Sequence, residues 1–165
     1  MKRITANKTT KLKVASTTIA LAMLTGSNIA MARPQIPEMS TCQGVISAVT
    51  SQIKAADKLY NQQDINTVVK GLAVYDNFIT TSIIDPQLLK ASNGNQSKIA
   101  KLQLQVERYK NLATLKYQNY YTDKKMHMDF AVALNNCTKI AAPAGSDLES
   151  LKASLLKIVE LAKRK

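Results

Sequence analysis

Residues 96–141 decide the fold of this chain. They read QSKIAKLQLQVERYKNLATLKYQNYYTDKKMHMDFAVALNNCTKIA and contain neither glycine nor proline. Apolar residues recur there at steps of three and four, which indicates helix. A single helix of this length would span about 68 Å, whereas the two helices predicted before it would span only ~30 Å each. The tract therefore predicts two helices, with the chain reversing near residues 120–125, where Thr122 or Asp123 can cap the second helix.

Each half of this tract has its own apolar face. We expect the first half to turn inward Ile99, Leu102, Val106, Tyr109, Leu112, Ala113, Leu115 and Tyr120. We expect the second half to turn inward Met126, Phe130, Ala133, Leu134, Cys137 and Ile140.

The residues on either side of this tract are also helical in pattern. Residues 33–41 contain two prolines and predict an extended lead-in, and a helix is expected from Ser40 or Thr41. Asp64 is the expected N-cap of a second helix that stops before Asp85, where Pro86 begins a short helix. After a break at residues 142–145, the residues 146–149 form a capping box for the last helix.

No segment alternates in the manner of a strand, so the fold class is all-α. Each long segment is amphipathic and cannot bury its own apolar face. The sequence therefore predicts an antiparallel bundle of four to five helices, formed by residues 33–165 as a single domain.

Cys42 and Cys137 are the two cysteines, and in an exported chain an even number predicts a disulfide. Their pairing also supports the chain reversal, because Cys42 lies at the beginning of the first helix and Cys137 must reach the same end of the bundle. A redox or metal-binding pair is disfavoured by the absence of a C-x-x-C motif.

Residues 1–32 have the pattern of a cleavable signal peptide. Five cations and no acid precede an apolar run at residues 14–24, and Ala30 and Ala32 are the small residues that signal peptidase prefers before a cut at Arg33. A retained membrane anchor is the alternative, but the run is short and interrupted by threonines. We therefore expect a periplasmic or extracellular protein with no transmembrane segment after cleavage.

The charge of residues 33–165 is basic, with 18 Lys and Arg against 11 Asp and Glu, a net +7. In an exported protein this balance favours an anionic envelope partner or an acidic protein over nucleic acid. Ordinary solubilising charge is the alternative, because only Lys163, Arg164 and Lys165 form a run, and these three are candidate binding residues.

The sequence Met126, His127 and Met128, flanked by Asp123 and Asp129, contains ligands that suit copper or haem iron. Neighbouring residues of a helix project about 100° apart, so the three cannot converge on one ion. Asp123 and His127 are the weak candidates for a metal. The alternative, which we favour, places Met126 in the core and pairs His127 with Asp123.

Tyr120 and Tyr121 are the candidate recognition residues, because two adjacent tyrosines cannot share one helical face and one of them must be exposed. Enzymes are disfavoured, since the chain has one histidine and lacks G-x-S-x-G, H-E-x-x-H and P-loop motifs. The sequence predicts an exported, non-enzymatic binding protein without a cofactor. A metal or haem carrier built around residues 126–128 is the alternative.

Overall fold

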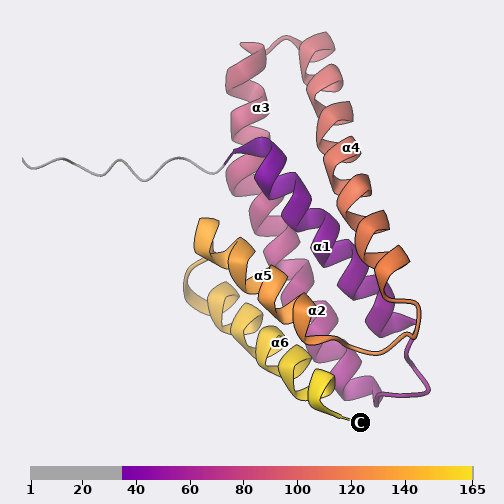
Figure 1. The fold of residues 1–165 in the computed structure, drawn as a ribbon. Coiled ribbons are helices and arrows are strands. Elements are labelled where there is room, and N and C mark those ends of the chain that lie inside the picture. Colours follow the sequence, from indigo (N-terminus) through magenta and orange to yellow (C-terminus); the bar gives the residue numbers. More distant parts are fainter. Residues whose placement is uncertain (1–34, 165) are drawn as a thin grey trace, which may run out of the picture. The chain divides into compact units, whose positions relative to one another are not determined.

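The structure, a computed structural model, describes residues 35–164, and five helices pack there as a bundle (Figure 1). The first is α1, Ile36–Lys54. The second is a continuous helical run made of α2, Gln62–Phe78, the π-helix η1, Ile79–Ile84, and α3, Asp85–Ser92. The last three are α4, Gln96–Tyr120, α5, Met128–Ile140, and α6, Gly145–Lys163. This confirms the all-α bundle, while the predicted signal peptide lies outside the described residues.

Two helix pairs make the most extensive contacts in the bundle, α1 with α4 and α2 with α6. Each pair approaches through a glycine. A Cβ added to Gly44 would lie 2.3 Å from the carbonyl oxygen of Lys110, and one added to Gly71 would lie 2.3 Å from that of Ser150. Consecutive helices alternate in direction, as predicted, but α1 and α4 run parallel to each other (Figure 1).

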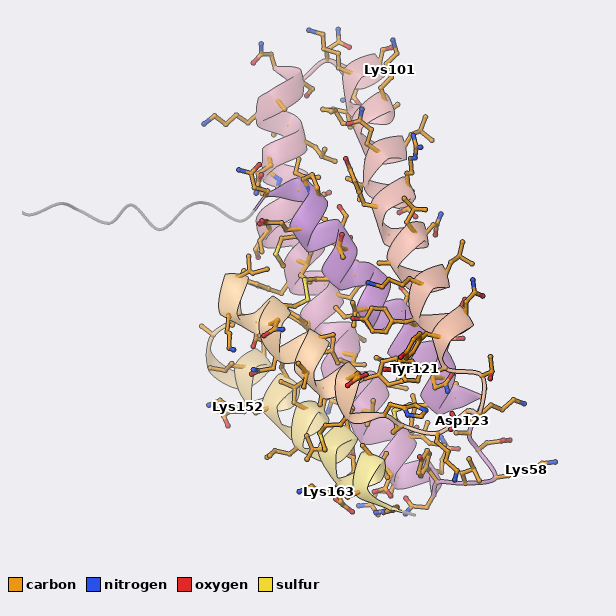
Figure 2. All side chains as sticks on the ribbon, viewed as in Figure 1. Lys58, Lys101, Tyr121, Asp123, Lys152 and Lys163 are labelled. Carbon is orange, nitrogen blue, oxygen red and sulfur yellow. A yellow bond between two sulfur atoms is a disulfide. The ribbon has the colours of Figure 1, made fainter. Side chains whose placement is uncertain are left out.

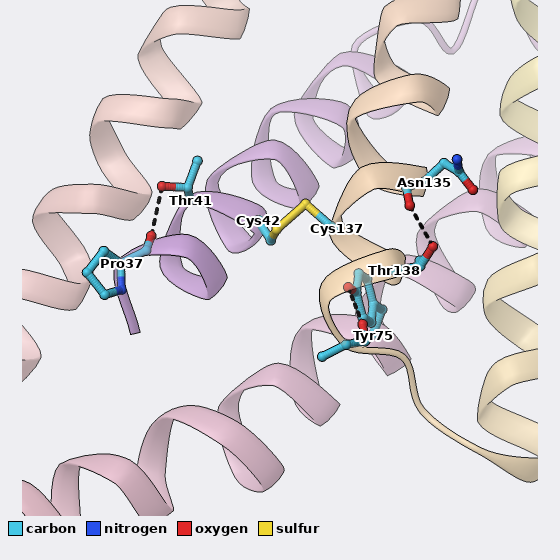
Figure 3. The surroundings of a disulfide bond; sticks show 8 residues. Pro37, Thr41, Cys42, Tyr75, Asn135, Cys137 and Thr138 are labelled. Atoms are coloured by element: carbon cyan, nitrogen blue, oxygen red, sulfur yellow. Dashed lines mark hydrogen bonds between the residues drawn. A yellow bond between two sulfur atoms is a disulfide. The ribbon is translucent and has the colours of Figure 1, made fainter. Parts of the chain in front are cut away.

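The disulfide between Cys42 and Cys137 joins α1 to α5 with its Cα atoms 5.8 Å apart, which confirms the predicted pairing (Figure 3). Both cysteines are buried. Near it, the hydroxyl of Tyr75 donates a hydrogen bond of 2.8 Å to the carbonyl oxygen of Ala141. Burial raises the pKa of Tyr75, so its phenol stays protonated as this donor.

The predicted reversal within residues 96–141 is confirmed, because α4 ends at Tyr120 and α5 begins at Met128. The expected cap is wrong. Neither Thr122 nor Asp123 precedes α5 directly, since His127 is its N-cap residue. Asp123 instead accepts a hydrogen bond of 3.1 Å from the backbone N–H of Lys125 within the loop.

The prolines end fewer helices than the sequence predicted. The described part of the predicted extended lead-in, from residue 35 on, is not extended, because α1 already begins at Ile36 with Pro37 in its first turn, where a missing N–H costs nothing. The second helix does not stop before Pro86. The N–H of Asp85 bonds the carbonyl oxygen of Thr80, five residues back, and this wide turn gives the proline ring room.

Two further helix starts differ from the prediction. Asn61, not Asp64, caps α2, because its side chain accepts a hydrogen bond of 2.8 Å from the N–H of Asp64. The capping box at residues 146–149 is absent, since α6 begins at Gly145 without a side-chain cap. Glu149 instead pairs with Lys152 at 2.8 Å.

The expected inward face of α4 is wrong in part. Only Val106 and Ala113 are buried on this 25-residue helix. Leu112 and Leu115 are 57% and 53% exposed, because at 100° per residue they lie about 120° and 180° around the helix from Val106. None of the helices between residues 35 and 164 has both the length and the hydropathy that crossing a bilayer requires.

Candidate functional site

Five aromatic rings gather where α4 ends and α5 begins, and we call them the aromatic cluster. Tyr121 is at its centre, with its ring centroid 4.2 Å from that of His127 and 4.8 Å from that of Phe130. Tyr117 stacks on Tyr121 at 6.5 Å, and Tyr120 meets it edge-on at 4.8 Å. Edge-on and offset rings are the arrangements that aromatic side chains prefer, so the cluster holds its members in place.

The loop between α4 and α5 is attached to the C-terminal end of α1 and to the segment that follows it. The N–H of Met126 donates a hydrogen bond of 2.9 Å to the hydroxyl of Tyr60, and Met126 itself is 3% exposed. The side chain of Gln52 donates to the carbonyl oxygen of Lys125 at 3.3 Å. Lys124 adopts a positive φ of 60°, which turns the chain back toward α5. The expectation that Met126 fills the core is therefore confirmed.

Two carboxylates fix the polar edges of the aromatic cluster. The hydroxyl of Tyr121 donates a hydrogen bond to the carboxylate of Asp129 on α5. Oδ1 of Asp123 lies 2.8 Å from Nε2 of His127. The predicted pair of Asp123 and His127 thus exists, although it spans a loop and not a helical turn. Figure 2 labels Tyr121 and Asp123 at this junction.

The local electrostatics keep Tyr117 and Tyr121 protonated and keep Asp123 ionised. Burial, and then the hydrogen bond to Asp129, raise the pKa of Tyr121. Burial, and then the charge of Asp129, raise the pKa of Tyr117. The hydrogen bond with His127, supported by the N–H of Lys125, lowers the pKa of Asp123. The two phenols therefore remain neutral near pH 7, which suits them to packing and hydrogen bonding and not to nucleophilic attack.

A hollow of about 330 Å³ opens beside the aromatic cluster, and we call it the tyrosine groove. Its residues come from the end of α4, from the loop and from one face of α5: Lys116, Tyr117, Tyr120, Tyr121, Asp129, Val132, Ala133 and Asn136. Tyr120 is 76% exposed and Val132 is 52% exposed. The exposed member of the tyrosine pair is therefore Tyr120, whereas Tyr121 is packed within the cluster.

A second hollow of about 280 Å³ adjoins the tyrosine groove along α4. Lys116 and Tyr117 line both hollows, and Thr41 and Val45 of α1 line the second one. The two hollows therefore adjoin through these two residues of α4.

The candidate metal residues do not form a larger ligand set. Among residues 35–164, no group of three His, Cys, Asp or Glu side chains is placed to hold a metal ion. Asp123 and His127 contact each other instead, with Oδ1 of Asp123 2.8 Å from Nε2 of His127. Met128 is half-exposed at the start of α5, whereas Met126 is buried. Asp123 and His127 thus remain a set of two among residues 35–164.

The candidate basic residues at the C-terminus are on a different helix from the tyrosines. Arg164 donates to Asp64 at 2.8 Å and also pairs with Glu160, so its charge is already matched within the fold. Lys163 is exposed near the end of α6 (Figure 2), and Lys165 lies outside the described residues. The structure thus does not bring the basic run and Tyr120 onto one helix.

Several residues of the tyrosine groove were missed by the sequence analysis. The signal was present, because Lys116, Tyr117 and Tyr120 recur at three- and four-residue steps on α4, and residues 129, 132, 133 and 136 do so on α5. What the sequence did not contain was the loop geometry that sets these two faces beside each other. The chain shows no match to family models, to curated proteins or to solved structures.

Proposed function

We propose that this protein is an exported binding protein, not an enzyme, and that the tyrosine groove recognises a segment of a protein partner outside the cytoplasm. The observation that carries the proposal is the exposure of Tyr120, 76%, on a cluster whose other rings are packed. A large aromatic side chain held in place beside a hollow is a typical binding anchor, because little side-chain entropy is lost when a partner covers it.

The groove also specifies the chemistry of that segment. Tyr120, Val132 and Ala133 supply apolar surface, so the segment carries apolar side chains. The carboxylate of Asp129 is engaged by Tyr121, which leaves Lys116 as the groove's cation without a carboxylate partner among the described residues. We therefore infer that the segment also carries a carboxylate.

The net charge supports this choice of partner. Residues 33–165 carry +7, and a basic protein approaches an acidic one faster at low salt. Long-range attraction falls off over a Debye length of about 10 Å at 0.1 M salt. Charge therefore accelerates encounter, while the rings of the groove provide the selectivity.

A capture experiment tests the proposal. Immobilised protein is used to recover partners from the native envelope fraction, and affinity for the recovered partner is measured for Tyr120→Ala, Tyr120→Phe and Leu156→Ala. We expect Tyr120→Ala to weaken binding roughly 10-fold or more, and Tyr120→Phe to retain it, because the ring is the anchor. Leu156 on α6 is 71% exposed and serves as the matched control.

Two results would contradict the proposal. One is a partner whose affinity is the same for Tyr120→Ala and for the unmodified protein. The other is a turnover reaction that depends on His127. Loss of fold does not confuse the test, since replacing an exposed residue such as Tyr120 changes stability by only about 0.5 kcal/mol.

A further inference from the structure

The outward face of α4 carries a second set of exposed residues that the tyrosine groove does not use. Leu104, Leu112 and Leu115 are 72%, 57% and 53% exposed. At 100° per residue, these leucines share an arc of about 80° with Lys101 and Arg108. We call these five residues the outer stripe. It lies roughly 150° around the helix from the buried Val106 and Ala113, so it faces away from the bundle.

The charge along this helix has one sign. α4 contains Lys98, Lys101, Arg108, Lys110 and Lys116 against the single acid Glu107. None of these cations pairs with a carboxylate among the described residues. The charged pairs found there lie in the loop before α5 and along α6 and its C-terminal end. The net charge of +4 on α4 is therefore available to an anionic partner.

We propose that the outer stripe docks the protein onto an anionic lipid surface, with α4 lying in the plane of the headgroups. Leucines alternating with lysine and arginine on one exposed arc are typical of helices that lie at a membrane interface. The leucine side chains enter the boundary of the acyl chains. The long side chains of Lys101 and Arg108 extend to the phosphates, as such residues do at interfaces.

Charge and shape disfavour two other partners for the outer stripe, a second copy of this chain and a different protein. A second copy of this chain would bring Lys101 and Arg108 against the same cations, and like charges at close range oppose association. A protein partner usually inserts anchors into pockets, but of the five stripe residues only Leu112 lines either of the two hollows described above. A lipid surface needs no pocket, because it adapts to a convex helix.

Vesicle binding tests the proposal and shows which charged residues attract the protein to the lipid. The protein is sedimented with phosphatidylglycerol and with phosphatidylcholine vesicles at 0.05 M and 0.5 M salt. We expect binding only to the anionic vesicles, and weaker binding at high salt. The double variant Lys101→Gln, Arg108→Gln should lower the partition coefficient about 25-fold, since each surface cation contributes roughly 5-fold.

The matched control is the double variant Lys54→Gln, Lys70→Gln. It removes the same net charge from exposed residues of α1 and α2. We expect it to change the partition coefficient by no more than about 3-fold, because those lysines are not on the stripe. Equal losses for both double variants would show that net charge alone attracts the protein, and would overturn the assignment to α4.

Insertion of the leucines has an independent readout, because the chain contains no tryptophan. Leu104→Trp and Leu156→Trp each introduce one reporter at positions of nearly equal exposure, 72% and 71%. On phosphatidylglycerol vesicles, we expect the emission of Trp at position 104 to shift to the blue and that at position 156 to stay unchanged.

Three results would overturn the proposal: no shift at position 104, an equal shift at both positions, or binding to a soluble acidic helical peptide without binding to vesicles. The last would identify the stripe as a protein-binding surface. The outcome is separate from that of the tyrosine groove, because Tyr120→Ala leaves all five stripe residues in place and should retain vesicle binding.

Discussion

Replacing Gly71 with alanine tests whether α2 and α6 are as close as the structure places them. The added Cβ would lie 2.3 Å from the carbonyl oxygen of Ser150 and 2.5 Å from the Cβ of Ser154. Ordinary contacts of this kind begin near 3.4 Å, so the two helices must separate by about 1 Å. A backbone carbonyl cannot rotate away as a flexible side chain can, which makes the separation unavoidable.

The magnitude follows from three effects. Overpacking costs about 1–3 kcal/mol. Separation also lengthens the buried hydrogen bond of 3.0 Å from the Ser154 hydroxyl to the carbonyl oxygen of Val68, worth about 1 kcal/mol. Against these, alanine favours a helix over glycine by about 1 kcal/mol. We expect a net destabilisation of about 2 kcal/mol, or a fall in Tm of roughly 5–10 °C for a domain of this size.

Thermal unfolding of the oxidised protein, followed by circular dichroism, measures this difference. Lys70→Ala is the control, because Lys70 is an exposed neighbour on the same helix and its replacement should change stability by only about 0.5 kcal/mol. Adding Ser154→Gly to Gly71→Ala should not restore the Tm, since the nearest atom is the carbonyl oxygen of Ser150. An unchanged or higher Tm for Gly71→Ala would refute the close approach of the two helices.

Two further predictions concern the covalent and ionic constraints. Cys42→Ser with Cys137→Ser, or reduction of the disulfide, should lower the free energy of unfolding by up to about 4–5 kcal/mol, because the bond closes a loop with a sequence separation of 95; urea titration with and without reductant measures the loss. Burial alone would raise the pKa of Asp64, but hydrogen bonds and charges from Lys157 and Arg164 outweigh it and lower that pKa. The stabilisation from Asp64 is therefore complete above its unfolded pKa of about 3.9 and is lost as the pH falls through the lower folded pKa. Asp64→Asn should remove this part of the acid dependence in unfolding curves measured from pH 6 to 2. An unaltered pH dependence of stability in this variant would contradict the role given to Asp64.

The disulfide and the reversal of the chain were predictable because they depend on parity and length. Cys42 and Cys137 can meet only if an odd number of reversals separates their helices, and a tract without glycine or proline was too long to be one helix beside its neighbours. The buried face of α1 includes Val45, Val49 and Ile53, which follow one another at steps of four in the sequence. Segment length, the number of chain reversals and apolar spacing are properties of whole segments. One residue at a helix end does not alter them.

The prolines were interpreted wrongly because one residue type has different effects at different positions. Pro37 falls in the first turn of a helix, and Pro86 follows a π-helical turn, so neither needs the N–H that it lacks. The sequence does not show where a wide turn will form. Helix boundaries that depend on it could not be predicted from residue type alone.

The candidate site was predictable in its exposed residue but not in its arrangement. Adjacent tyrosines at positions 120 and 121 required one exposed ring, and the structure shows that this ring is Tyr120. The stacking of Tyr121 on His127 depends on a loop with a positive φ at Lys124 and on a hydrogen bond from Met126 to Tyr60. Such contacts join residues far apart in the chain, which periodicity cannot detect.

The position of α4 leaves one helix exposed at both the proposed outer stripe and the proposed tyrosine groove. With Val106 and Ala113 as its buried residues, it rests on α1 through Gly44 and leaves most of its circumference exposed. Tyr120 lies about 140° around the helix from Leu115 but only about 80° from Leu112, which also lines the second hollow beside the tyrosine groove. In the proposed docking, a lipid surface therefore also covers Leu112 at the edge of the second hollow, whereas Tyr120 and the α5 side of the tyrosine groove lie outside the stripe.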